Sequence, residues 1–180
     1  MPDLNVKFID PSIIVGQLGL EKGITVADFG CGSGYFSLPV AQTIGSDGVL
    51  YALDVLPSAL ESIESRAKIM GLTNIIIKRV NLEKENGSKL EGNSLDWIIL
   101  KDMLFQNAMK DIILAETYRV LKSGGRMLVV EWNEYDSSMG PEQKLRIKKD
   151  DMIVLIQAQK FSIEREVSAG NFHYALVVRK

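Results

Sequence analysis

Alternating glycines follow a short apolar segment in the run Val26-Ala27-Asp28-Phe29-Gly30-Cys31-Gly32-Ser33-Gly34. Glycine lacks a Cβ atom, so the backbone can bend sharply at these positions and a ligand can approach it closely. A helix that begins after the loop would also offer unpaired backbone N–H groups in its first turn. The run predicts a ligand-binding loop between a strand and a helix; the alternative is a turn with a purely structural role.

The residues around this loop indicate which kind of ligand it would take. A dinucleotide-binding loop carries Gly or Ala three residues after Gly32, where close packing of the helix requires it, but this chain has Tyr35. Asp28 stands two residues before Gly30, and its carboxylate would repel a pyrophosphate and attract an ammonium group. The loop therefore favours a cationic ligand. The alternative, an NAD-dependent oxidoreductase, would also need a Ser-Tyr-Lys set that we do not find.

A carboxylate ends the second apolar segment, Val49–Asp54. At the end of a strand, Asp54 can accept hydrogen bonds from both hydroxyls of a ribose. It could equally cap a helix that begins at Pro57. With the glycine loop upstream, the ribose role is favoured.

A third polar position is Asn81, which follows the apolar segment 74–80. Its amide and the adjacent backbone N–H could contact the edge of an adenine ring. Leu56 and Leu82 would then lie on the two faces of that ring. The alternative is that residues 81–83 form an ordinary polar loop.

The elements that must position these residues alternate between strands and helices, as an α/β fold requires. The segments NIIIK and DWIIL are continuously apolar, which suits a parallel sheet covered on both faces. Ligands of such sheets bind outside the carboxyl ends of the strands. We expect strands over 25–29, 49–54, 74–80, 95–100 and 126–132, a closing antiparallel hairpin of 161–167 and 172–179, helices over 11–20, 35–44, 57–70, 109–121 and 148–159, and a tight turn at 123–125.

The composition excludes several kinds of site. The chain has 180 residues, a formal net charge of −2, one cysteine and one histidine. An intramolecular disulfide and a cysteine- or histidine-built metal centre are therefore not expected. Residues 144–149 are rich in Lys and Arg, but acidic residues follow directly and no aromatic residues interleave, so no strong nucleic-acid signature is present. Without an apolar leader or membrane span, the sequence predicts a cytoplasmic protein.

These features together resemble class I S-adenosylmethionine-dependent methyltransferases, in the ubiquinone/menaquinone-biosynthesis-like (methyltransferase type 11) branch. The similarity is carried by the loop Asp28–Gly34, by Asp54 and by RVLKSGGRMLVVEW at Arg119–Trp132. It implies an α/β, Rossmann-like three-layer sandwich whose seven-stranded, mostly parallel sheet has the order 3-2-1-4-5-7-6, with strand 7 antiparallel. It also implies a single domain over residues 1–180, with only a minimal N-terminal cap.

The resemblance implies S-adenosylmethionine as the cofactor and assigns residues to it by their position in the family's motifs. The methionine part would contact Asp28, the backbone of Gly30, Gly32 and Gly34, and Lys101. Asp54 would bind the ribose. Val55, Leu56, Asn81 and Leu82 would contact the adenine.

The acceptor side is less well defined. Asp102, just beyond strand 95–100, is the candidate base or orienting group, or else a surface acid paired with Lys101 or Lys110. Glu131 and Trp132, which end strand 126–132, could line the substrate side; the alternative for Trp132 is simple packing at the rim. Many relatives carry a histidine after the fourth strand and this chain does not, so their histidine-based proton abstraction is not carried over.

The predicted reaction is an in-line transfer of the cofactor's methyl group to an acceptor that the sequence does not identify. The protein's main tasks would be to position that acceptor and to exclude water. The short cap indicates an open site for a large substrate, or a homo-oligomer in which a partner subunit supplies the lid. A non-catalytic S-adenosylmethionine-binding domain is the main alternative.

Overall fold

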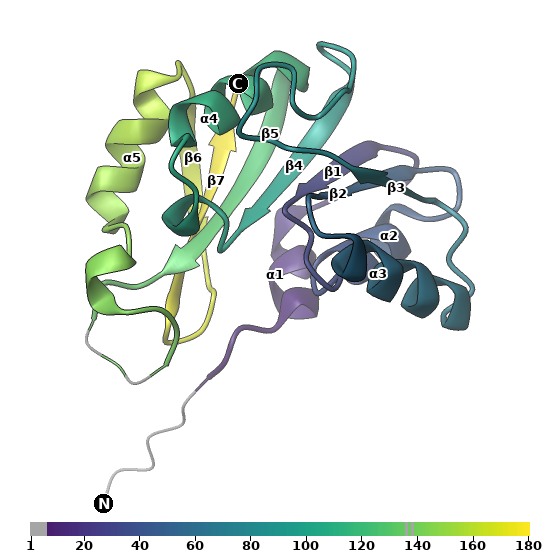
Figure 1. Ribbon diagram of the computed structural model, residues 1–180, viewed down its shortest axis with the longest axis horizontal. Helices are drawn as coiled ribbons and strands as arrows, with labels where there is room; N and C mark the ends of the chain where they lie inside the picture. Colours follow the sequence, from purple (N-terminus) through teal and green to yellow (C-terminus); the bar gives the residue numbers. More distant parts are fainter. Residues whose placement is uncertain (1–6, 136, 138) are drawn as a thin grey trace, which may run out of the picture.

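A computed structural model describes residues 7–135, 137 and 139–180. They form a seven-stranded sheet of order β3-β2-β1-β4-β5-β7-β6 with helices on both faces, which confirms the predicted Rossmann-like architecture (Figure 1). The strands are β1 (Thr25–Phe29), β2 (Val49–Asp54), β3 (Ile75–Arg79), β4 (Leu95–Lys101), β5 (Leu121–Trp132), β6 (Ser162–Val167) and β7 (His173–Arg179). The helices are α1 (Pro11–Leu18), α2 (Ser37–Ile44), α3 (Pro57–Ile69), α4 (Lys110–Val120) and α5 (Lys149–Ala158), with short 3-10 turns η1 (Leu104–Gln106) and η2 (Gln143–Leu145).

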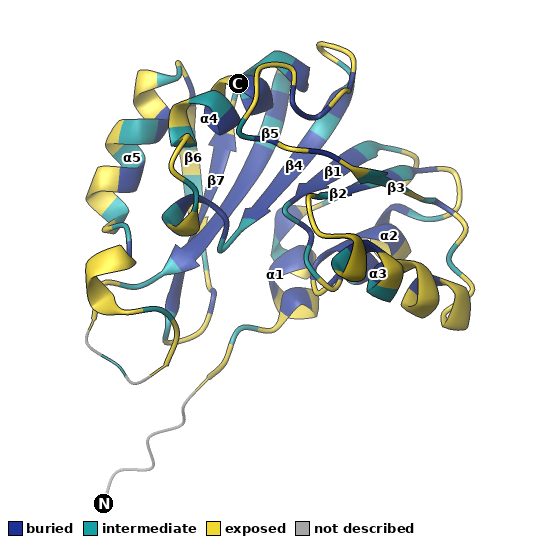
Figure 2. Cartoon of the chain, in the orientation of Figure 1, coloured by how far each residue is buried: buried dark blue, intermediate teal, exposed yellow. Residues whose placement is uncertain are grey.

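The core lies on both faces of the sheet, because successive side chains of a strand point to opposite faces. Along β4, Ile98 and Leu100 pack with α4 and α5, whereas Trp97 and Ile99 pack with α1 and α2. The inner strands are accordingly buried while the outer helix faces are exposed (Figure 2). The continuously apolar segment of β4 is thus explained by helices on both sides, whereas β3, at the edge of the sheet, is only partly buried and exposes Ile76.

Most predicted elements are present, with shifts of a few residues at their ends. Asp10 caps α1 as expected, its Oδ1 accepting from the Ser12 amide at 2.9 Å, and Gly19 ends the helix with φ +68°. The chain between the glycine loop and α2 forms turns, so α2 begins at Ser37 rather than at Tyr35. The predicted turn at 123–125 and the strand start at 126 differ more clearly from the structure.

In the structure these residues lie inside one strand, β5, which already begins at Leu121. The pairing of β5 with β4 is irregular there, with a register shift between Leu95 and Trp97, and Gly124 has φ +75°. Some bulges and some tight turns place a glycine at positive φ. The Gly-Gly pair alone therefore could not distinguish a bulge within a strand from a turn before it.

The last strand determines what meets at the carboxyl edge of the sheet. β7 runs antiparallel to β5, in a register that pairs Trp132 with His173. The start of β7 therefore lies beside the end of β5, at the same edge as the ends of β1, β2 and β4 (Figure 1). A residue from near the end of the chain is thereby placed at the edge where ligands of such sheets bind.

Candidate functional site

The glycine loop between β1 and α2 uses its own backbone amides internally. The amides of Gly30 and Cys31 donate to the Leu53 carbonyl at 2.8 and 3.1 Å, and the Gly34 amide donates to the Cys31 carbonyl at 3.0 Å. The Gly32 amide donates to Asp54 Oδ2 at 2.9 Å. The main contribution of these glycines to a ligand is therefore room for close approach, because their N–H groups are already satisfied.

Two glycines of the loop have different tasks. A Cβ atom on Gly32, which has φ +51°, would meet nothing within 4 Å, so this position faces open space. A Cβ on Gly34 would lie 2.8 Å from Cγ1 of Ile63, so Gly34 allows α3 to pack against the loop. The absence of a side chain at Gly32 thus keeps a cleft open, and its absence at Gly34 permits helix packing.

Asp54 lies at the end of β2 with both carboxylate oxygens held by backbone amides. Oδ2 accepts from Gly32 and Oδ1 accepts from Leu56, each at 2.9 Å. A carboxylate has about four lone-pair sites, so each oxygen retains one for a further donor. The contact with Leu56 also shows the helix-start capping that was considered as the alternative, and the two roles are compatible.

A cavity of 370 Å³ opens between the glycine loop, the end of β2 and η1. It contains seven of the ten residues that the family resemblance assigned to the cofactor. Its lining also includes five residues that sequence analysis did not find. The wall is formed by Gly30, Gly32, Asp54, Val55, Leu56, Val80, Asn81, Leu82, Glu83, Met103, Gln106 and Asn107.

The unpredicted part of this wall is held together by side-chain contacts to the backbone. Glu83 Oε1 accepts from the amides of Ala108 and Met109, at 2.9 and 3.1 Å, just before α4 begins. Gln106 Nε2 donates to the Asp102 carbonyl at 2.8 Å. A Glu followed some 25 residues later by an apolar helical segment gives no sequence signal for such a contact.

Asp28 lies behind the loop and does not line the cavity. Its side chain is buried, and Ser37 Oγ donates to its Oδ2 at 2.6 Å. Burial raises the pKa of Asp28 to about 6, and the negative charge of Asp54 adds to the rise. Its assignment to the cofactor's methionine part stays a prediction. The hydrogen bond from Ser37 ties the end of β1 to the start of α2.

Lys101 ends β4 and Asp102 follows it, and the two side chains form an ion pair with each other. Asp102 adopts φ +50°, a left-handed conformation that turns the chain sharply into η1. Its second oxygen, Oδ1, lies 3.3 Å from Nε2 of His173. The pairing with Lys101 matches the alternative considered from the sequence, while the neighbouring histidine was not anticipated.

Glu131 and Trp132 lie at the end of β5, beside the cavity rather than in its lining. Glu131 is 1% exposed, and its Oε1 accepts from the amides of Leu104 and Phe105 at 2.7 and 3.3 Å. Trp132 packs against the imidazole of His173, with ring centroids 4.1 Å apart. Their assignment to the substrate side stays a prediction, and both contacts stabilise the edge where a substrate would enter.

The pKa of Glu131 makes the stability of the protein depend on pH. Burial, followed by the charge of Asp102, raises this pKa from 4.5 to about 8. Between these values the folded protein holds a proton that the unfolded chain releases, so the free energy of unfolding falls as pH rises. The loss is at most about 1.4 kcal/mol per pH unit for one proton. We expect Glu131→Gln to flatten this decline, measured by urea denaturation from pH 6 to pH 8.

This pH range separates Glu131 from Asp28, whose raised pKa is about 6. The exposed Glu21→Gln provides a matched control and should retain the wild-type slope. An unchanged slope in Glu131→Gln would show that the buried carboxyl is already ionised at neutral pH.

The basic run at residues 144–149 is only partly outward-facing. Arg146 is 9% exposed and points inward, where its guanidinium donates to the carbonyls of Tyr135 and Met139, both at 2.6 Å, and to that of Pro141 at 3.0 Å. It also lies 5.8 Å from the centre of the Trp132 ring. Arg146 therefore shapes the chain after β5 and does not present its charge to a partner.

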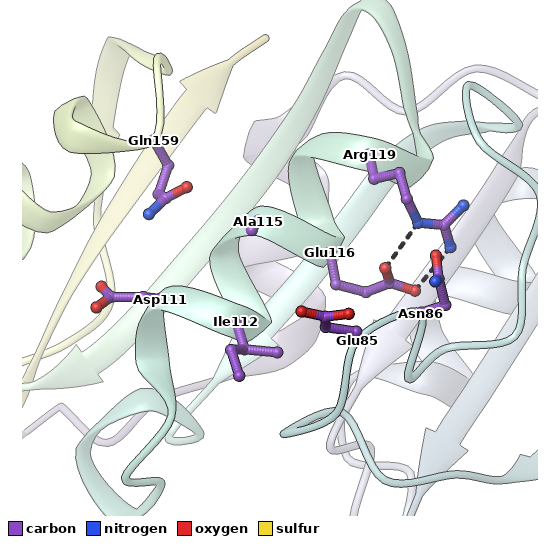
Figure 3. A pocket seen from close by; sticks show the side chains of 8 residues that line it. All are labelled: Glu85, Asn86, Asp111, Ile112, Ala115, Glu116, Arg119 and Gln159. Atoms are coloured by element: carbon purple, nitrogen blue, oxygen red, sulfur yellow. Dashed lines mark hydrogen bonds and ion pairs between the residues drawn. The ribbon is translucent and has the colours of Figure 1, made fainter.

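A second cavity, of 480 Å³, lies against α4 and does not share residues with the first (Figure 3). At one end of it, the buried Glu116 accepts from Arg119 Nε and Nη2, each at 2.8 Å, and from Ser88. Burial raises the pKa of Glu116, but the hydrogen bonds from Arg119 and Ser88 outweigh it and hold the pKa below its usual value. The carboxylate is already fully engaged, so this cluster is structural.

Removal of the Glu116 carboxylate should lower stability without affecting the first cavity. Glu116→Ala leaves the Ser88 amide and hydroxyl without an acceptor and Arg119 without its partner. We expect a loss of about 3 kcal/mol in the free energy of unfolding, measured by urea denaturation. Glu85→Ala, an exposed change in the same cavity, should cost less than about 0.5 kcal/mol. Equal effects of the two changes would contradict the structural role of Glu116.

In the part of the chain that the structure describes, no helix is long and apolar enough to cross a membrane. The same residues contain no group of three or more His, Cys, Asp or Glu side chains that could hold a metal ion.

The sheet order and the cavity beyond β1 and β2 define a class, that of Rossmann-like methyltransferases. The fold is similar to the crystal structure of an S-adenosylmethionine-dependent methyltransferase from Aquifex aeolicus, with a TM-score of 0.87 and 21% identity over 96% of this chain and 90% of that one. Residues 20–170 match the family model described as "Methyltransferase domain", and the chain belongs to this family. S-adenosylmethionine is the cofactor of the family and of these structural neighbours.

Two curated relatives are similar over part of their length. The ubiquinone/menaquinone biosynthesis C-methyltransferase UbiE of Haemophilus ducreyi is 30% identical over 118 residues, which cover 64% of this chain and 44% of that protein. An arsenite methyltransferase of Aquipseudomonas alcaligenes is 26% identical over 130 residues, covering 70% of this chain and 37% of that protein. The chain thus spans less than half of each of these relatives.

Proposed function

We propose that this chain catalyses methyl transfer from S-adenosylmethionine to an acceptor bound at the carboxyl edge of the sheet. The observation that carries the proposal is the cavity beside Gly32, where a Cβ atom would meet nothing within 4 Å and where Asp54 retains acceptor capacity. Membership of the methyltransferase-domain family supports it.

The residues present fit this cofactor. Asp54 would accept hydrogen bonds from the ribose hydroxyls, and its two backbone contacts hold it in position for them. Leu56 and Leu82 supply apolar surface for the adenine, and the Asn81 amide group supplies a polar edge beside it. When bound, the cofactor supplies an electrophilic methyl group on a sulfonium.

The chain's own contribution to catalysis is to bind, to orient and to exclude water. Met103 covers Gly30, since a Cβ on that glycine would lie 3.2 Å from Met103 Cγ, and this closes the cavity wall toward β4. Gln106 and Asn107 fix η1 by bonding to backbone carbonyls. These contacts give the site a rigid floor on which an acceptor can be aligned.

For the acceptor we propose a hydroxylated aromatic ring. The similarity to UbiE, a C-methyltransferase of ubiquinone and menaquinone biosynthesis, supports this class. Aromatic residues lie at the same edge: Trp132 ends β5 and is paired with His173, and Phe172, the residue before β7, packs against Phe8 with ring centroids 5.6 Å apart. Arsenite is disfavoured, because Cys31 is the single cysteine, is buried, and has a pKa raised by that burial.

The test is a calorimetric titration with S-adenosylmethionine and, separately, with NAD. We expect heat from the first and none from the second; the reverse would favour an oxidoreductase. Transfer of a labelled methyl group to 1,4-naphthoquinol then separates an enzyme from a non-catalytic binding domain. Binding without transfer to this probe would count against the proposed acceptor class and leave the cofactor assignment standing.

Three further expectations belong to the same proposal. We propose a cytoplasmic location, which cell fractionation tests. If residues 1–180 act as a single functional domain, a protein of these residues should bind the cofactor in the calorimetric titration.

If a partner subunit of a homo-oligomer supplies the lid, light scattering should give a mass in solution above the 20.0 kDa of one chain.

A further inference from the structure

The chain's one histidine, His173, lies at the edge of the sheet that carries the cavity. It begins β7 and is paired across the sheet with Trp132. Its side chain is only 4% exposed. A buried imidazole at a ligand-binding edge needs an explanation, since histidine is the side chain best suited to exchange protons near neutral pH.

Two neighbours fix the orientation of this imidazole. The Trp132 ring lies 4.1 Å from it, centroid to centroid, at an interplanar angle of 39°. Asp102 Oδ1 lies 3.3 Å from Nε2, and the other oxygen of Asp102 is paired with Lys101. The Asp102 carboxylate therefore faces Nε2 of the imidazole, while Nδ1 lies on the other side of the ring.

Unpaired polar atoms are concentrated at this one place. Among the described residues, four buried side-chain atoms have no hydrogen-bond partner: Asp102 Oδ1, Glu131 Oε2, and both ring nitrogens of His173. Leaving such an atom unpaired costs about 1–3 kcal/mol. Two of these atoms, Asp102 Oδ1 and His173 Nε2, face each other at 3.3 Å, which leaves Nδ1 of His173 as the ring atom without a neighbouring polar group. Since buried polar groups are rarely left unpaired, Nδ1 indicates a position that a polar group of a ligand completes.

The cluster adjoins the cofactor cavity through the backbone of η1. Asp102 directly precedes Met103, and its carbonyl accepts from Gln106 Nε2. Both Met103 and Gln106 line the cavity. The chain thus connects Asp102 directly to the cavity wall, and His173 lies beside Asp102 at the end of the sheet where β5 and β7 pair.

Resting on the proposed function, we propose that His173 is the base that takes the proton of the acceptor's hydroxyl, and that Asp102 is the positioning residue that orients it. The acceptor's O–H bond breaks, its electron pair stays on the oxygen, and the proton forms a new N–H bond at Nδ1 of His173. The imidazolium is balanced by the Asp102 carboxylate on the Nε2 side. The proton returns to water when the product leaves.

Glu131 supports this division of roles. Its raised pKa of about 8 keeps it neutral at pH 7, so Asp102 provides the negative charge next to the histidine. A neutral Glu131 can also donate a hydrogen bond, because one of its oxygens is free of protein partners while the other accepts from Leu104 and Phe105.

The first test needs neither cofactor nor acceptor. Because the chain has one histidine, a ¹⁵N-histidine-labelled sample gives a single pair of ring signals. We expect the neutral ring to carry its proton on Nε2, facing Asp102, and we expect Asp102→Asn to remove that preference. A proton on Nδ1 in the wild type, or a spectrum unaffected by Asp102→Asn, would overturn the assignment.

The second test uses 1,4-naphthoquinol as the probe acceptor. His173→Ala should lower kcat by about 10²-fold. Its calorimetric Kd for S-adenosylmethionine should stay at the wild-type value. Added imidazole should restore turnover, whereas pyrazole, which has the same shape and is a far weaker base, should not. Unchanged turnover, equal recovery with both compounds, or no recovery with imidazole would each overturn the proposal.

Two controls keep this test decisive. If His173→Ala fails to fold because Trp132 loses its packing partner, the nearly isosteric Asp102→Asn must show the same loss of kcat with normal cofactor binding. If the wild type does not methylate 1,4-naphthoquinol, the proposed acceptor class is wrong, and the tautomer measurement still decides whether the Asp102–His173 pair exists.

Discussion

Replacement of Gly32 by valine is expected to abolish binding of S-adenosylmethionine while the protein still folds. At this position an added Cβ points into the open cavity and meets no protein atom within 4 Å. The new side chain would therefore occupy ligand space and would not disrupt the core. Its cost is backbone strain at φ +51°, of about 1–3 kcal/mol, which a domain with a stability of about 5–15 kcal/mol can tolerate.

The measurement pairs calorimetry with thermal unfolding, and Gly34→Ala is the matched control. A Cβ on Gly34 would lie 2.8 Å from Ile63, so this variant should lose stability because α3 is displaced. Gly32→Val should instead lose binding at a Tm only modestly lowered. Wild-type affinity in Gly32→Val would place the cofactor away from the glycine loop.

Asp54→Ala should weaken cofactor binding by about 2–3 kcal/mol, which is about 30- to 150-fold in Kd. Two effects add in this variant. The charge-assisted hydrogen bonds to the ribose are lost, and the amides of Gly32 and Leu56 lose the acceptor that holds the two loops together. Asp54→Asn keeps the shape and one acceptor oxygen, so its effect should be smaller.

Asp47, close to the other end of β2, offers a matched control for Asp54. It is exposed in the turn that precedes β2, at the opposite end from Asp54, so Asp47→Ala removes the same charge from the protein without approaching the cavity. Its Kd should match the wild type. A loss of affinity shared equally by both variants would mean that long-range charge, and not contact, explains the effect of Asp54.

The fold was largely predictable from the sequence, because the apolar segments, the glycine loop and the turn residues all indicate the same alternating architecture. Asp54 and Leu56 were identified for the same reason, since local spacing after a strand determines where such residues lie. Their presence in the wall of one cavity follows from parallel pairing of β1 with β2.

What sequence analysis missed depends on contacts between distant segments. Asp28 is bonded to Ser37 behind the loop, a contact that the loop sequence alone does not reveal. The meeting of Asp102 with His173 joins residues 71 positions apart and requires β7 to pair with β5. The sequence shows only that no histidine follows the fourth strand, whereas the proximity of His173 to Asp102 arises across the sheet.

The position of β7 also has a consequence for synthesis on the ribosome. β6 leaves the ribosome before β7, yet β7 lies between β5 and β6 in the sheet. Until β7 inserts, β6 has no partner and β5 presents an apolar, unpaired edge, Met127–Val130, that invites pairing with another nascent chain. Slow release of the final strand should therefore favour aggregation of this protein, and protection of that edge by a chaperone should raise its soluble yield.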